Sequence, residues 1–96
     1  MKFDKPVHWN SDKNLELMRE RGISFDEVLS VVETVGVLQT IDHPNQERYA
    51  HQRMWIVNVK NYAYLVPHVV TDEEIFLKTI IPSRKATKQF KLEKSQ

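Results

Sequence analysis

The apolar pattern changes its period at Gly36, and this change limits the possible folds more than any other feature of the chain. The apolar residues before it are spaced as one broad face of a helix, and they are Phe25, Val28, Leu29, Val32 and Val35. After Gly36 the apolar residues alternate with polar ones or form short runs bounded by turn residues, which is typical of strands. The pattern therefore predicts an α+β fold with helices first and a sheet after them.

Two helices are predicted at the N-terminal end. Ser11 is suited to cap a first helix over 12–21, with Gly22 as the left-handed residue that ends it. Ser24 and Glu27 have the spacing of a capping box, which begins the second helix. Both helices therefore carry start or stop signals in addition to their apolar spacing.

Four strands and a short final helix are predicted in the rest of the chain. The strand segments are 37–42, 54–60, 62–71 and 75–82, and the segment 48–52 is left open between strand and loop. Pro67 indicates an edge position or a bulge, because proline cannot donate a ladder hydrogen bond. Ser83 is suited to cap a helix over 84–91. The expected architecture is two N-terminal helices packed on a four-stranded, mainly antiparallel sheet, plus this short C-terminal helix.

Length and composition exclude several classes of protein. The 96 residues suit one domain, which we expect to span 1–96 with a disordered end over about 92–96. No apolar run approaches a membrane span, the N-terminus lacks a signal-peptide core, and there is no cysteine for disulfide or thiolate chemistry. The four histidines have no zinc-site spacing. We therefore expect a cytoplasmic protein that contacts no membrane and holds no metal or cofactor.

Positive charge is concentrated at the C-terminal end. The segment 78–96 carries six basic residues against Glu93, a net charge of +5, whereas the rest of the chain carries −4. This end is either a solvated tail or a surface that contacts phosphates. Arg84 differs from its neighbours, because a cation is disfavoured at a helix N-terminus while its planar fork suits phosphate. The residues expected to contact RNA are Lys78, Lys85, Lys88, Lys91 and Arg53.

A few ionisable residues on the predicted sheet are candidates for chemistry. His68 lies beside Pro67 on a strand, although a half-buried histidine bonded to the backbone would give the same pattern. Glu47 and Arg48 either form a surface ion pair or supply proton transfer and phosphate stabilisation, and His51 is interpreted as an exposed loop residue. A metal-free ribonuclease needs a base, an acid and cations for the phosphorane. The residues of suitable type, without being specific to this chemistry, are His68, Glu47, Arg48, Arg84 and Lys78.

Five segments in order along the chain resemble one known family. They are VHWNSDKNL at 7–15, RGISFDEV at 21–28, ERY at 47–49, VPH at 66–68 and IIPSRKAT at 80–87. Together they resemble the BrnT family of bacterial type II toxins, and the resemblance covers almost the whole chain. Thr79 departs from the pattern, since the family commonly has an arginine at that place.

The resemblance implies a RelE-like fold and a metal-independent endoribonuclease that inhibits translation by cleaving mRNA, on or off the ribosome. It also implies a cognate antitoxin as partner, and contact with operator DNA only through that antitoxin. The catalytic residues that it implies are Glu47, Arg48, His68 and Arg84. Two other functions stay open. The first is a non-catalytic module whose basic end holds nucleic acid or an acidic protein. The second is a structural protein whose last helix docks on another chain.

Overall fold

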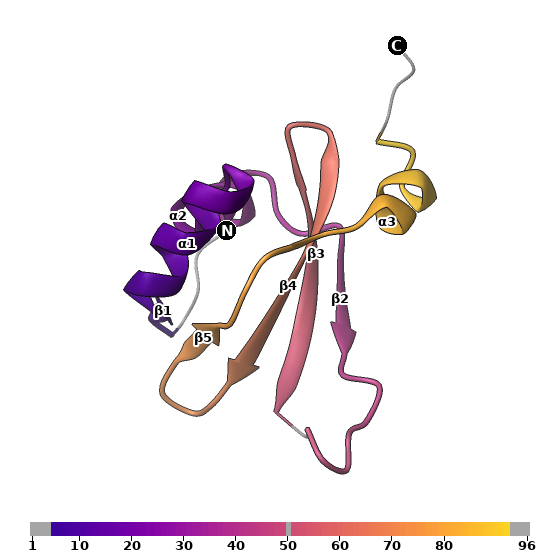
Figure 1. Ribbon diagram of the computed structural model, residues 1–96. Coiled ribbons are helices and arrows are strands. Elements are labelled where there is room, and N and C mark those ends of the chain that lie inside the picture. The colour runs from indigo at the N-terminus through magenta and orange to yellow at the C-terminus, as the bar shows by residue number, and fades with distance from the viewer. Residues whose placement is uncertain (1–4, 50, 93–96) are drawn as a thin grey trace.

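A mixed sheet with helices on both of its faces forms the fold (Figure 1). The computed structural model describes residues 5–49 and 51–92. Within them the elements are β1 (Val7–Trp9), α1 (Ser11–Arg21), α2 (Phe25–Thr34), β2 (Gln39–Asp42), β3 (Gln52–Val59), β4 (Tyr62–Val70), β5 (Ile75–Leu77), β6 (Ile81–Pro82) and α3 (Arg84–Gln89). No helix in these described residues is long and apolar enough to cross a bilayer.

The sheet has the strand order β1-β5-β4-β3-β2, and β6 pairs with β4 beside this path. β1 runs parallel to β5, and the other pairs are antiparallel. We predicted an α+β fold, which the structure has, but the prediction of four strands was wrong. β1 was missed because three residues are too few to show alternation, and the expected strand over 75–82 is divided into β5 and β6.

The two faces of the sheet bury different clusters. α1 and α2 cover the first face, which we call the helix-pair face, where Phe25 and Val28 pack in one core with Val57 of β3 and Val66 of β4. α3 covers part of the second face, which we call the α3 face, through a smaller cluster of Ile56, Ala63 and Ala86. Because strand side chains alternate, β3 and β4 each contribute to both clusters.

Local capping signals explain where the first two helices begin. Ser24 caps α2 as predicted, since its hydroxyl accepts a hydrogen bond from the Glu27 backbone N–H at 3.1 Å. The cap of α1 is Asn10 rather than Ser11, because the Asn10 side chain accepts from the Lys13 N–H at 2.9 Å. Ser11 is then the first residue of the helix.

The ends of the two helices differ from each other. Gly22 ends α1 in the left-handed conformation with a φ of 67°, as predicted. α2 ends at Thr34, so Val35 lies past its last turn and is 81% exposed. The expectation that Val35 belongs to the apolar face was therefore wrong.

Pro67 lies in an interior strand, not at an edge, because β4 sits between β3 and β5. The pairing of β4 with β3 is uninterrupted across Pro67. On the opposite edge of β4, His68 pairs with Leu77 of β5 and Leu65 pairs with Ile81 of β6. The three residues 78–80 therefore lie opposite only two residues of β4, 66 and 67. The expected bulge is thus present in the opposing strand, at the point where proline cannot donate a ladder hydrogen bond.

Thr87 attaches α3 to the sheet. Its buried hydroxyl accepts from the Ala63 N–H at 2.9 Å and donates to the Ser83 carbonyl at 2.8 Å. Ser83 caps the helix as predicted, accepting from the Ala86 N–H at 3.1 Å. The helix is shorter than the predicted 84–91, and Leu92, at the start of the end expected to be disordered, packs on the α3 cluster. The remainder of the expected disordered end, 93–96, lies outside the described residues.

Candidate functional site

The four residues predicted to be catalytic do not form one cluster in the structure. Glu47 and Arg48 lie in the loop between β2 and β3 at one end of the sheet, whereas Arg84 begins α3 at the other end (Figure 1). His68 points from β4 toward the helix-pair face, and α3 lies on the opposite face. Their types suit the chemistry, and the structure places them in three separate parts of the fold.

His68 is a core residue, and its Nδ1 is hydrogen-bonded to the backbone. It is 2% exposed, its Nδ1 lies 2.9 Å from the Val66 carbonyl oxygen, and its ring packs 4.3 Å from that of Trp55. A carbonyl can only accept, so Nδ1 carries the hydrogen. Burial lowers the pKa of His68 below its ordinary 6.5, the bond to Val66 opposes that shift, and the charge of Arg53 adds to it. The imidazole is therefore neutral at neutral pH.

The loop that carries Arg48 is an ordered turn. Asn45 accepts from the Arg48 N–H at 3.2 Å through its side chain and from the Tyr49 N–H at 2.9 Å through its carbonyl. The Tyr49 ring packs against His43 with centroids 4.2 Å apart, and the Arg48 guanidinium lies 5.6 Å from the centre of the Tyr49 ring. Arg48 is thus held as an exposed surface cation, with Glu47 exposed beside it.

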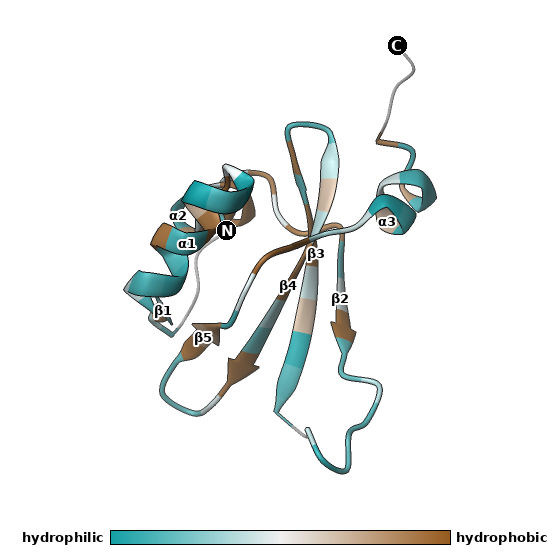
Figure 2. Ribbon diagram, viewed as in Figure 1, coloured by the Kyte–Doolittle hydropathy of each residue, from teal (hydrophilic) through white to brown (hydrophobic). Residues whose placement is uncertain are grey.

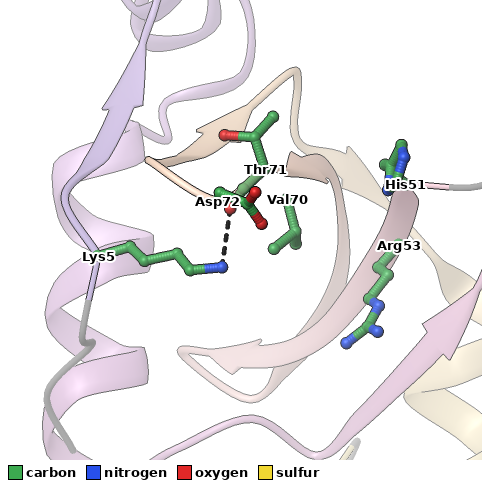
Figure 3. A pocket seen from close by; sticks show the side chains of 6 residues that line it. All are labelled: Lys5, His51, Arg53, Val70, Thr71 and Asp72. Atoms are coloured by element: carbon green, nitrogen blue, oxygen red, sulfur yellow. Dashed lines mark hydrogen bonds between the residues drawn. The ribbon is translucent and has the colours of Figure 1, made fainter.

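A pocket of about 390 Å³ brings together a different set of ionisable residues (Figure 3). They come from three separate segments, the one before β1, the start of β3 and the end of β4. Figure 3 shows Lys5 and Arg53 extending into the pocket from opposite sides. The residues that line it are Lys5, His51, Arg53, Val70, Thr71 and Asp72.

Backbone contacts hold the three segments of the pocket in place. The Lys5 ammonium donates to the Thr71 carbonyl at 2.7 Å, which ties the start of the described chain to the end of β4. The Val70 N–H donates to the His51 carbonyl at 3.0 Å, which joins β4 to the start of β3. Arg53 lies on β3 with its Nε 3.6 Å from an Asp42 carboxylate oxygen. These contacts fix where the cationic groups stand relative to one another.

The pocket has the composition of an anion site that can also move protons. Arg53 offers a two-pronged donor for a phosphate or carboxylate, and Lys5 offers a compact positive charge. His51 supplies an imidazole, the side chain that enzymes use most often for general acid–base catalysis. Asp72 is the single acid in the lining. In the described residues, no three His, Cys, Asp or Glu side chains come together in a way that could hold a metal ion.

Sequence reasoning found little of this pocket. Arg53 was among the residues expected to contact RNA, and His51 was interpreted only as an exposed loop residue, which its exposure confirms. Lys5 and Asp72 were not singled out. The available signal was the alternation of His51 and Arg53, which places both on the helix-pair side of the sheet. The contact of Lys5 with Thr71 joins residues 66 positions apart and leaves no local pattern.

The other residues expected to contact RNA lie on or next to the α3 face. Lys78 follows β5, Lys85 and Lys88 are on α3, and Lys91 comes just after it. All four side chains are exposed, and none takes part in the ion pairs recorded for residues 5–49 and 51–92. They form a basic surface separate from the pocket.

The chain was compared with known proteins in three ways. It matches no protein-family description, no curated protein and no solved structure. The resemblance to the BrnT toxins therefore rests on the five sequence segments alone.

Proposed function

We propose that the chain is a toxin similar to those of the BrnT family, which cleaves RNA in the pocket between β1, β3 and β4. The observation that carries the proposal is the convergence of Lys5, His51 and Arg53 in one pocket with Asp72. A metal-independent ribonuclease needs cations on the phosphate and groups that accept and donate protons. The pocket residues offer all of these, whereas Glu47, Arg48, His68 and Arg84 are dispersed.

In this proposal the ribose 2′-oxygen attacks the adjacent phosphorus, and the bond from phosphorus to the 5′-oxygen breaks. Asp72, as a carboxylate, takes the proton of the 2′-hydroxyl, and His51, as an imidazolium, gives a proton to the leaving 5′-oxygen. Arg53 and Lys5 stabilise the charge that gathers on the phosphorane oxygens. No cofactor enters these steps, because the RNA itself supplies the nucleophile.

The biological setting follows from the resemblance. The substrate is mRNA in the cytoplasm, and cleavage stops translation. A cognate antitoxin neutralises the protein, and operator DNA is reached only through that antitoxin. These partners come with the proposal and stand or fall with it.

Growth arrest and RNA cleavage test the proposal together. His51→Ala and Arg53→Ala should each relieve the growth arrest caused by expressing the chain alone, and should lower cleavage of single-stranded RNA by about 100-fold or more. His43→Ala, in the neighbouring loop, and Arg19→Ala, on α1, are matched controls that should leave both readouts unchanged. If growth arrest and RNA cleavage persist in the two pocket variants, the pocket is not the site of the reaction.

The dispersion of the predicted catalytic residues favours a second candidate, a module that holds nucleic acid without cutting it. The exposed lysines on and around α3 would then bind the phosphates. Binding that weakens steeply with salt, with intact RNA recovered after long incubation and no growth arrest, would support this alternative over the toxin.

A further inference from the structure

The α3 face carries a strip of apolar side chains that the described helices leave uncovered. The strand register places these side chains next to one another across β2, β3, β4, β5 and β6. Met54 of β3 pairs with Ile41 of β2 on one side and with Pro67 of β4 on the other. Val69 of β4 pairs with Phe76 of β5, and Leu65 of β4 pairs with Ile81 of β6. We call this the open strip, and it consists of Ile41, Met54, Pro67, Val69, Phe76 and Ile81.

None of the described helices packs on the open strip. α1 and α2 belong to the core of the opposite face, and α3 packs on Ile56 and Ala63. Ile41 and Ile81 are 38% and 39% exposed, and the other members of the strip are half-buried. Figure 2 shows the hydrophobic colour at the ends of β2, β4 and β5. A contiguous apolar strip of this kind on a sheet face is typical of an interaction site.

The charge on the α3 side of the open strip has one sign. The segment 75–92 contains no acidic residue. Its basic residues are all exposed, and none is in an ion pair recorded for the described part of the chain. They are Lys78, Arg84, Lys85, Lys88 and Lys91. A ligand on the strip therefore meets an unneutralised positive border on the α3 side.

We propose that the open strip, with its basic border, is the docking surface for an acidic amphipathic helix of a different protein. Apolar side chains of that helix would cover Met54 and Phe76, and its carboxylates would reach Lys85 and Lys88. A second copy of this chain fits poorly, since an isologous contact would bring the two basic borders together. RNA fits poorly as well, since its phosphates gain nothing from the apolar side chains.

The docking surface and the cationic pocket lie on different faces, so the proposal goes beyond the proposed ribonuclease and does not depend on it. Arg53 belongs to the row of β3 side chains on the helix-pair face, whereas Met54 points the other way. Both surfaces can therefore be occupied at the same time. An inhibitor bound on the open strip would have to act without filling the pocket.

Fluorescence anisotropy with a labelled peptide tests the docking surface on the full chain. The probe is a helical peptide of about 18 residues with leucines on one face and glutamates on the other. The controls are the same peptide with lysines in place of glutamates, a scrambled acidic peptide and a single-stranded RNA. We expect that only the acidic amphipathic peptide binds saturably. Its affinity should fall about tenfold in the Ile41→Ser variant, and also in a double variant with Lys85→Glu and Lys88→Glu.

Matched variants on α1 distinguish the loss of this docking surface from a general effect of surface substitutions on peptide binding. Leu15 is 57% exposed, so Leu15→Ser and Arg19→Glu should leave peptide binding unchanged, as should Arg53→Ala in the pocket. Equal weakening by the α1 variants, or equal binding of the lysine peptide, overturns the proposal. RNA binding that the Ile41 and lysine variants abolish would assign the face to nucleic acid. A dimer that Ile41→Ser dissociates would assign it to a second copy.

Discussion

Arg53 and His68 lie directly opposite each other in the pairing of β3 and β4, yet they occupy different environments. The Arg53 side chain is 54% exposed and lines the pocket, whereas His68 is 2% exposed and belongs to the core. The boundary between the core and the pocket therefore runs through this one cross-strand pair. Across this pair, the positive charge of Arg53 helps to lower the pKa of His68.

The lowered pKa of His68 makes stability depend on pH. The unfolded chain binds a proton at a higher pH than the folded one, so the contribution of neutral His68 is complete above pH 6.5 and is lost as the pH falls below it. Urea unfolding at several pH values between 5 and 8 should show this decline. His68→Gln should be less stable at all pH values and should flatten the decline, and an unchanged slope in that variant would contradict the assignment.

Thr87→Val should destabilise the chain by about 1–3 kcal/mol, because it leaves the buried Ala63 N–H without its acceptor. The shape of the side chain is kept, so packing changes little. Thr40→Val on the exposed strand β2 is the matched control and should change stability by no more than about 0.5 kcal/mol. Chemical denaturation measures both, and equal effects would mean that Thr87 does not anchor α3.

Exchange of the two candidate caps of α1 gives a sharp test of helix geometry. Asn10→Ala should lower the free energy of unfolding by about 1 kcal/mol, since the Lys13 N–H loses its acceptor. Ser11→Ala should be neutral or slightly stabilising, because alanine is the better residue inside a helix. The reverse ranking in denaturant titrations would place the cap at Ser11.

Arg53→Lys separates charge from geometry in the proposed site. Lysine keeps the positive charge but loses the two-pronged donor, so RNA cleavage should fall by about tenfold or more, equivalent to one charge-assisted hydrogen bond. Lys5→Arg keeps the charge and should have a smaller effect. Initial rates of cleavage of a short labelled RNA measure both, and full activity in Arg53→Lys would show that only charge is needed there.

The sequence was most informative where the controlling contacts are local. The Ser24 cap, the Gly22 helix end and the Ser83 cap each depend on residues within one turn, and all three were predicted. The same reasoning missed β1 because its evidence is pairing with β5, some 68 residues later in the chain. Local pattern carries no information about such a partner.

The candidate site was harder to predict for the same reason. Alternation places His68 on the same face of β4 as Val66, but it does not show that the histidine is buried. Nor could residue type show that Lys5 reaches Thr71 or that His51 shares a pocket with Arg53. Residues of a suitable chemical type are easily found in a sequence. Which of them come together in the fold depends on contacts between distant parts of the chain.

The parallel pairing of β1 with β5 also fixes when the pocket can exist. Val7–Trp9 is synthesised before α1 and α2, but its partner strand Ile75–Leu77 is made only after β4. Lys5 likewise has no Thr71 carbonyl to bind until 66 further residues have been translated. A nascent chain can form α1 and α2 and still lack the wall that Lys5 provides. The pocket is therefore absent from any nascent chain in which β5 has not yet been made, and it appears only after that strand has joined β1.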